Sequence, residues 1–312
     1  IVSEFMSNIF FDKDIISIRD LSLTEINLIL KLAKKFKKKP PKKYLLNKII
    51  AHCFFEPSTR TRLSFETATL RLGGQVIGFS NSENISTKKG EDLSDTIRTI
   101  SYYADLIIIR HPREGAARLA AEVSDKPIIN AGDGANQHPT QALADLFTIQ
   151  EAQGNLEGLS IALVGDLKYG RVIHSLLQIC ALFNMRLFLL APSLLALPEA
   201  LCDELKHQGI RFSFHSNLDE IISRVDILYM TRLQRERFTE SEHELFESQY
   251  VLTPDKLKKA KTNLKILHPL PRAGEIDKLI DKLPYAFYFN QVANAIYIRQ
   301  AILALLLGKI ES

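Results

Sequence analysis

Cysteine is scarce in this chain of 312 residues, and the few cysteines form no metal-binding or disulfide pattern. Cys53, Cys180 and Cys202 lie far apart, and none belongs to a Cys-x-x-Cys pair. Zinc sites need clustered ligands and disulfide-stabilised domains need a dense set of cysteines, so both classes are excluded. Isolated thiols are typical of reduced proteins, and they predict a cytoplasmic location.

Long apolar runs are also missing. No run reaches the roughly 18 residues that a membrane-spanning helix requires. The N-terminal residues lack the basic-then-apolar order of a signal peptide. Even the most apolar helical segment, 293–307, is too short and too amphipathic to cross a bilayer. We therefore expect no membrane partner.

Neither sign of charge dominates: the formal net charge is +4, with 24% charged and 46% hydrophobic residues. These values are ordinary for a soluble globular protein, and a modest positive charge suits small acidic substrates. The most basic run, 34–43, ends a predicted helix over 22–39, where lysines interact favourably with the helix dipole. It has few aromatic residues on which bases could stack. We expect a solvated helix end and no nucleic-acid partner.

The glycine motifs of nucleotide-binding proteins are absent. The segment 165–171, Gly-Asp-Leu-Lys-Tyr-Gly-Arg, follows a predicted strand and opens a predicted helix. It matches neither Gly-x-Gly-x-x-Gly nor Gly-x-x-x-x-Gly-Lys-Ser/Thr, which disfavours NAD and ATP sites.

What is present is an alternation of apolar strand-length runs with helical patterns, which predicts an α/β protein with two βαβ domains and parallel sheets. A short polar break at 154–158 separates the two series. The predicted strands are 49–55, 76–79, 105–110, 127–132, 159–166, 186–190, 211–214, 226–232 and 263–272. The predicted helices are 22–39, 63–72, 93–104, 138–153, 171–183, 198–208 and 293–307.

The densest group of anion-binding side chains is segment 55–62, Phe-Glu-Pro-Ser-Thr-Arg-Thr-Arg. It lies between a predicted buried strand and a predicted helix, with Ser58 as a natural N-cap. The backbone N–H groups of a helix start lack intrahelical partners and carry partial positive charge. Two arginines and three hydroxyls in this turn favour a bound phosphate. The alternative is a polar helix start without a ligand.

Three further candidates lie beside predicted strand ends. Arg110 and Arg232 each end an apolar strand, and His138 opens a helix after a Gly/Asp/Asn-rich turn. Ligands of open parallel sheets bind at the carboxyl ends of the strands, so these side chains are candidates for a site. A lone histidine at a helix start is more often structural, and His138 becomes a candidate only through its place among the other motifs.

Four motifs follow one another in order: 58–62 (Ser-Thr-Arg-Thr-Arg), 138–145 (His-Pro-Thr-Gln-Ala-Leu-Ala-Asp), 165–171 and 268–272 (His-Pro-Leu-Pro-Arg). Together they resemble the transcarbamylases. Lys89-Gly90-Glu91 and segment 231–237 (Thr-Arg-Leu-Gln-Arg-Glu-Arg) narrow the resemblance to aspartate carbamoyltransferase catalytic chains. The resemblance covers about Asn8 to Leu307.

This resemblance implies a transcarbamylase fold. Residues 1–139, completed by a C-terminal helix at 293–312, would bind carbamoyl phosphate, and residues 140–292 would bind aspartate. The implied reaction transfers the carbamoyl group of carbamoyl phosphate to the α-amine of L-aspartate, giving N-carbamoyl-L-aspartate and phosphate in de novo pyrimidine biosynthesis. No metal and no organic cofactor are implied.

The resemblance also implies individual roles. The implied carbamoyl phosphate ligands are Ser58, Thr59, Arg60, Thr61, Arg110, His138 and Gln141, together with Ser86 and Lys89 of an adjacent subunit. Among them, the implied catalytic residues, which hold the leaving phosphate or polarise the carbonyl, are Arg60, Thr61, Arg110 and His138. The implied aspartate ligands are Lys89, Arg171, Arg232, Gln234, the Leu270 carbonyl and Pro271, which fixes that carbonyl.

The resemblance further implies a homotrimer with shared active sites and, in some members, a separate regulatory chain. Ornithine carbamoyltransferase is the alternative, because it shares the first two motifs. That family has a cysteine where this chain has Pro269, and its pocket accepts a cationic side chain. Arg171 and Arg232 favour a dicarboxylic amino acid instead, because guanidinium groups match carboxylates.

Overall fold

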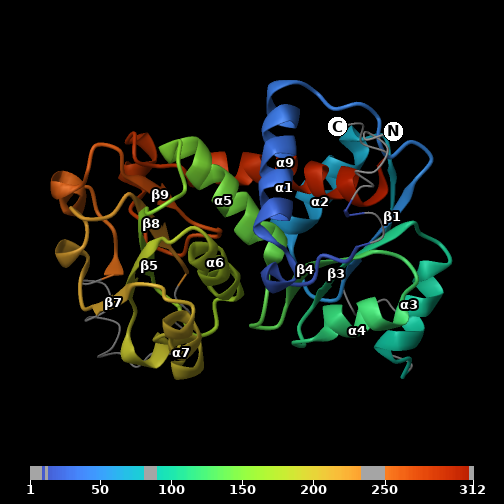
Figure 1. Cartoon of the computed structure of the whole chain (residues 1–312), viewed down its shortest axis with the longest axis horizontal. Helices are drawn as coiled ribbons and strands as arrows, with labels where there is room; N and C mark the ends of the chain where they lie inside the picture. The colour runs from blue at the N-terminus through green and yellow to red at the C-terminus, as the bar shows by residue number, and fades with distance from the viewer. Residues whose placement is uncertain (1–8, 11–12, 81–89, 233–249, 309–312) are drawn as a thin grey trace. The chain divides into compact units, whose positions relative to one another are not determined.

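The computed structural model describes residues 9–10, 13–80, 90–232 and 250–308. The chain divides into two compact units (Figure 1). Unit 1 comprises the residues up to Ala144 and those from Ala293 onward, and unit 2 comprises Asp145–Val292. The division falls within two helices, α5 (Pro139–Gln153) and α9 (Tyr288–Leu307).

Unit 1 contains a four-stranded sheet with the order β2-β1-β3-β4, and every pair in it is parallel. The strands are β1 (Ile49–Phe54), β2 (Gln75–Phe79), β3 (Leu106–His111) and β4 (Ile128–Asp133). Its helices are α1 (Leu23–Lys38), α2 (Thr59–Arg71), α3 (Leu93–Ser101) and α4 (Ala116–Val123), after the 3₁₀ turn η1 (Ile18–Asp20). Parallel neighbours joined through helices are the βαβ arrangement that the sequence predicts.

Unit 2 contains a five-stranded parallel sheet with the order β7-β6-β5-β8-β9. The strands are β5 (Ser160–Val164), β6 (Arg186–Leu190), β7 (Phe212–His215), β8 (Ile227–Met230) and β9 (Lys265–Leu267). Its other helices are α6 (Arg171–Leu182) and α7 (Glu199–His207). The 3₁₀ turns are η4 (Ser193–Leu195), η5 (Leu218–Glu220), η7 (Asp255–Lys259) and η8 (Lys278–Lys282). The prediction of an α/β fold with two parallel sheets is confirmed.

Several predicted boundaries were wrong. Helix α2 begins at Thr59 rather than at residue 63, so the Ser-Thr-Arg-Thr-Arg motif forms its first turn. Helix α9 begins at Tyr288 rather than at 293. Strand β9 covers only Lys265–Leu267, because the two prolines that follow cannot donate to a ladder. Helix α4 was missed altogether, since its eight residues, Ala-Ala-Arg-Leu-Ala-Ala-Glu-Val, are too few for a clear period.

The two ends of α1 have the features that its sequence predicts. Ser22 accepts the backbone N–H of Glu25, and the Glu25 carboxylate accepts the backbone N–H of Ser22, which completes a capping box for α1. At the other end, Lys34, Lys35, Lys37 and Lys38 are exposed. The first part of the basic run thus forms the last turns of α1, with its lysines exposed.

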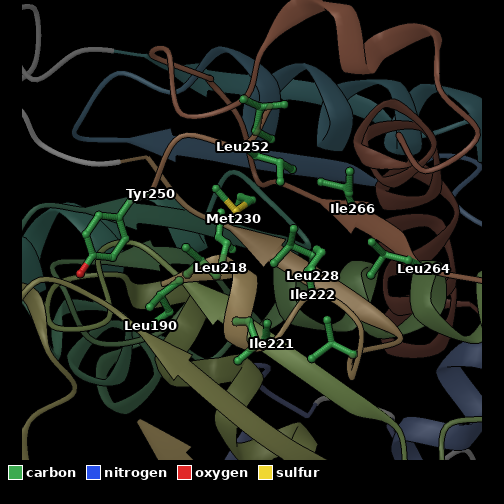
Figure 2. Close-up of a cluster of buried hydrophobic side chains, with 14 of the residues drawn as sticks. Leu190, Leu218, Ile221, Ile222, Leu228, Met230, Tyr250, Leu252, Leu264 and Ile266 are labelled. Atoms are coloured by element: carbon green, nitrogen blue, oxygen red, sulfur yellow. The ribbon is translucent and has the colours of Figure 1, made fainter. Parts of the chain in front are cut away.

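Each sheet is anchored by a buried apolar layer. In unit 1, Ala51 and Cys53 of β1 pack with Ile107 and Ile109 of β3 against residues of α3 and α4. In unit 2, a larger cluster covers one face of the sheet (Figure 2), with Leu190, Leu228, Met230 and Ile266 pointing into it. Burial of one such side chain contributes about 2 kcal/mol, more than an exposed ion pair. The cores therefore fix where the strand ends lie.

Within the described residues, no helix is both long and apolar enough to cross a membrane.

Candidate functional site

The first turn of α2 is the anion cradle, which we define as residues 58–61. Ser58 occupies the N-cap position with an extended backbone, and its hydroxyl makes no capping hydrogen bond within the described chain. Thr59 and Arg60 are exposed, whereas Thr61 is buried. Although Arg60 lies at the surface, desolvation by neighbouring atoms lowers the pKa of its guanidinium from the ordinary value, and the group remains charged at neutral pH. The hydroxyls and the guanidinium thus surround the positive end of a 13-residue helix.

His138 lies directly before α5 and approaches the cradle. Its Nε2 is 3.5 Å from Thr61 Oγ1, and both residues are buried. Gln141 lies in the first turn of α5, where its N–H donates to the carbonyl of His138. The structure therefore brings together two motifs that are 77 positions apart in the sequence.

The turn before His138 is held by a buried carboxylate that the sequence motifs did not indicate. Asp133, at the end of β4, accepts backbone N–H groups from Gly115 at 2.9 Å and from Gln137 at 3.1 Å. It also accepts side-chain amides from Asn130 at 2.8 Å and Asn136 at 3.0 Å. The Asp/Gly/Asn-rich composition marked a turn, but the convergence of these donors required the fold.

Arg110 lies in β3, close to its carboxyl end, and is held by a carboxylate. Its Nε is 2.8 Å from Glu56 Oε1, and the two side chains are 14% and 23% exposed. One guanidinium N–H also reaches the carbonyl of Ala131 at 3.5 Å. Because Glu56 directly precedes the segment that caps α2, the pair fixes Arg110 beside the cradle.

In unit 2, Arg171 and Arg232 follow the ends of neighbouring strands. Arg171 is the first residue of α6, after the turn that leaves β5, and Arg232 lies two residues beyond β8. Thr231 ties the two strand ends together, because its Oγ1 accepts the N–H of Asp166 at 2.8 Å and donates to the Val164 carbonyl at 3.0 Å. Strand pairing across Leu163 and Tyr229 continues this connection.

A third element of unit 2 follows β9. Leu270 has a left-handed backbone, with φ of 57°, and the Leu270–Pro271 peptide bond is cis. Strand β9 pairs with β8, so this turn leaves the sheet beside the segment that carries Arg232. The described residues of the predicted aspartate-binding set, Arg171, Arg232 and the Leu270–Pro271 turn, thus follow three adjacent strands.

The predicted residues fall into two described sets. Unit 1 carries the cradle, Arg110, His138 and Gln141, all near the ends of β1, β3 and β4. Unit 2 carries Arg171, Arg232 and the Leu270–Pro271 turn. Ser86, Lys89 and Gln234 lie outside the described residues. Among the residues that the structure describes, no group of three or more His, Cys, Asp or Glu side chains could hold a metal ion.

Two models of known protein families match this chain. A family model described as the carbamoyl-P binding domain of aspartate/ornithine carbamoyltransferase matches residues 13–151, and one described as the Asp/Orn binding domain matches residues 157–306. The chain belongs to the aspartate/ornithine carbamoyltransferase family. The resemblance seen in its motifs is thereby confirmed.

Relatives within this carbamoyltransferase family are similar along nearly their whole length. The aspartate carbamoyltransferase catalytic subunit of Vibrio campbellii is 55% identical over 97% of this chain and 99% of the relative. That of Chromobacterium violaceum is 52% identical over 96% of this chain and 99% of the relative.

Solved structures of the family share the fold. Aspartate transcarbamoylase from Trypanosoma cruzi, in complex with carbamoyl phosphate and aspartate, has a TM-score of 0.90 at 36% identity and covers 97% of this chain and 98% of its own. The catalytic subunit of M. jannaschii aspartate transcarbamoylase has a TM-score of 0.87 at 48% identity and covers 93% of this chain and 96% of its own.

Proposed function

We propose that this carbamoyltransferase moves the carbamoyl group of carbamoyl phosphate to the α-amine of L-aspartate, giving N-carbamoyl-L-aspartate and phosphate for pyrimidine biosynthesis. The observation that carries the proposal is identity of 52% and 55% to aspartate carbamoyltransferase catalytic subunits over nearly the full chain. The T. cruzi complex with both substrates supports the same pair of ligands.

Carbamoyl phosphate is bound by unit 1 in this proposal. The phosphate accepts hydrogen bonds from the cradle, where backbone N–H groups, hydroxyls and Arg60 offer donors to its oxygens. Arg110 bridges the phosphate and the carbonyl oxygen. His138 and Thr61 donate to that carbonyl oxygen, and Gln141 accepts from the carbamoyl amide. The short distance between His138 and Thr61 supports their action on one oxygen.

Aspartate is bound by unit 2. Arg171 and Arg232 pair with its two carboxylates, since a planar guanidinium can donate two parallel hydrogen bonds to one carboxylate. The Leu270 carbonyl accepts a hydrogen bond from the amine. Ornithine has a cationic side chain that two arginines would repel, so the described charges of unit 2 favour aspartate over ornithine.

The chemistry requires no covalent intermediate. The amine lone pair attacks the carbamoyl carbon, the carbon–oxygen bond to phosphate breaks, and the amine proton passes to the departing phosphate. Negative charge develops on the carbonyl oxygen, where Thr61, Arg110 and His138 donate. One such donor contributes about 3 kcal/mol to transition-state stabilisation. Positioning of the two substrates supplies most of the remaining rate.

We also propose a cytoplasmic homotrimer in which Ser86 and Lys89 complete the phosphate site of the neighbouring subunit. The motif Lys89-Gly90-Glu91 supports this assignment, and Cys53, Cys180 and Cys202, which are free and buried, suit a reducing compartment. A regulatory chain is a further partner that the name "catalytic subunit" of the relatives suggests.

The test is a substrate comparison on the purified protein. With carbamoyl phosphate, we expect phosphate release and formation of carbamoyl aspartate when aspartate is added, and no citrulline when ornithine is added. Phosphate should raise the thermal unfolding midpoint, whereas bulk DNA should not. Carbamoylation of ornithine instead of aspartate would overturn the proposal.

A further inference from the structure

The turn that carries Leu270 is held by a buried histidine. Leu270 donates its backbone N–H to Nδ1 of His268 at 2.8 Å. His268 is fully buried, and its own N–H donates to Oε1 of Gln291 at 2.9 Å. Because Leu270 has a φ of 57°, which L residues adopt only under local constraint, this contact supports an otherwise unfavourable backbone.

The contact also fixes the histidine tautomer. Since Nδ1 accepts the N–H of Leu270, the ring proton resides on Nε2. That nitrogen lies 2.6 Å from Oε1 of Glu275, within ion-pair distance although outside good hydrogen-bond alignment. Glu275 is 2% exposed, and its other oxygen accepts the N–H of Ala273 at 2.9 Å. The Glu275 carboxylate therefore contacts both the ring of His268 and the backbone of Ala273, which follows the turn.

Glu275 stays charged despite its burial. Burial raises the pKa of its carboxyl, but contacts with His268 and with backbone N–H groups outweigh this effect, so the pKa lies below its ordinary value. An ionised Glu275 attracts the Nε2–H dipole and keeps Nδ1 as the acceptor. Burying a carboxylate and an imidazole costs more free energy than burying an apolar pair of the same size. Their presence here therefore favours a specific role for the pair.

The rest of the network connects the turn to the interior of unit 2. Gln291 donates to Oδ1 of Asp145 at 2.6 Å, and Tyr229 donates to Oδ2 of Asp145 at 2.7 Å. Asp145 lies in α5 and Tyr229 in β8. Through Gln291, the backbone of His268 is thus connected to the strand that precedes Arg232.

We infer that Glu275 and His268 are positioning residues, which hold Leu270 so that its carbonyl receives the substrate amine. This inference rests on the proposed function, because it assigns that carbonyl to the amine of aspartate. Neither side chain touches substrate in this arrangement. They act on the amine through the backbone of the turn, whereas Arg171 and Arg232 act on the carboxylates.

The experiment compares aspartate with succinate, a dicarboxylate of the same length that lacks the amine. In His268→Leu the KM for aspartate should rise about tenfold, because the Leu270 carbonyl is displaced and its hydrogen bond to the charged amine is weakened but not removed. The KM for carbamoyl phosphate and the inhibition constant of succinate should stay within twofold. A general loss of structure would weaken succinate as much as aspartate.

Conservative variants test the mechanism. An asparagine oxygen can accept the N–H two residues onward, so His268→Asn retains the contact with Leu270 but leaves Glu275 without its partner. Combining it with Glu275→Gln removes that isolated charge, and the double variant should have an aspartate KM nearer to the unsubstituted protein than His268→Leu has. Glu275→Gln alone, which keeps the shape of the side chain, should raise the aspartate KM about threefold even if His268→Leu fails to fold.

The chain offers a matched control. His215 and Glu220 form another His–Glu pair at 3.1 Å, at the β7 edge of the same sheet and opposite the β9 edge. His215→Leu should leave both the aspartate KM and succinate inhibition unchanged. A folded His268→Leu with a normal aspartate KM, or with equal weakening of aspartate and succinate, would overturn the inference.

A double-mutant cycle separates the two proposals. Thermal unfolding of the single and double His268 and Glu275 variants measures their coupling without substrate. If the effects of the two substitutions on unfolding free energy simply add, His268 and Glu275 do not interact and the inference is wrong. Absence of aspartate carbamoylation by the unsubstituted protein, with coupling present, would refute the proposed function instead.

Discussion

The carboxylate of Asp226 accepts hydrogen bonds from several parts of unit 2. It accepts from Lys261 at 2.8 Å, from the backbone N–H of Ser160 at 3.0 Å, and from Asn263 at 3.2 Å. Burial raises the pKa of Asp226, but these donors outweigh burial, so its pKa lies below the ordinary 3.8. A depressed folded-state pKa stabilises the fold above 3.8, and this stability is lost as the pH falls through the lowered value.

We therefore predict that Asp226→Asn changes the acid sensitivity of the protein. The unsubstituted chain should lose more unfolding free energy between pH 5 and about pH 2 than the variant does, because only the former must protonate this carboxylate. Urea unfolding at each pH measures the difference. Asp219→Asn, which alters an exposed carboxylate, should follow the unsubstituted curve. Equal slopes for all three proteins would contradict this assignment.

Arg232 gives the second prediction at this scale. Arg232→Ala should raise the aspartate KM by roughly 30-fold or more, since hydrogen bonds to charged groups contribute about 2 kcal/mol. Carbamoyl phosphate binding should change little. The measurement is the initial rate as a function of the concentration of each substrate. Arg232→Lys should recover only part of the loss, because lysine lacks the planar guanidinium that donates two parallel hydrogen bonds. Normal aspartate saturation in Arg232→Ala would remove Arg232 from the site.

Among the elements, β2 lies at the edge of the sheet of unit 1 and runs close to β1. Gly78 pairs with His52 and has a φ of 134°. A Cβ at this position would lie 2.1 Å from the carbonyl oxygen of His52. The pairing therefore requires glycine, both for its backbone angle and for the approach of the two strands.

Gly78→Ala should therefore destabilise unit 1 by about 3 kcal/mol, from backbone strain and steric overlap together. Gly158→Ala is the control, because Gly158 has a φ of 70° but no atom within 4 Å of an added Cβ. It should cost only about 1 kcal/mol. Chemical denaturation provides both values. Similar losses in the two variants would mean that β2 can move away from β1 at little cost.

At the scale of the whole molecule, the proposed homotrimer predicts complementation. Lys89→Ala and Arg171→Ala trimers should each have little activity, since every site lacks one part. Mixed and reassembled trimers should recover a fraction of the activity, because some sites then combine an intact Lys89 with an intact Arg171 of the neighbouring subunit. Size measurement confirms assembly. Reassembled hybrids that stay inactive would rule out shared sites.

The sequence determined the fold class and the family without help from coordinates. Apolar runs of strand length and helix caps depend on neighbouring residues, so β6 was predicted over 186–190 and is observed as Arg186–Leu190. The capping box of Ser22 and Glu25 is equally local. Short or irregular elements were missed, as α4 was, because eight residues give too little periodicity.

The tertiary structure alone decided which distant side chains meet. Nothing in the sequence pairs Glu56 with Arg110, or places Asp133 under the turn before His138. His268 and Glu275 are only seven residues apart, but their contact depends on the turn after β9, in which Leu270 has a φ of 57°. Periodicity and capping act over a few residues, whereas the Glu56–Arg110 pair forms because parallel strands β1 and β3 bring their carboxyl ends to one edge of a sheet.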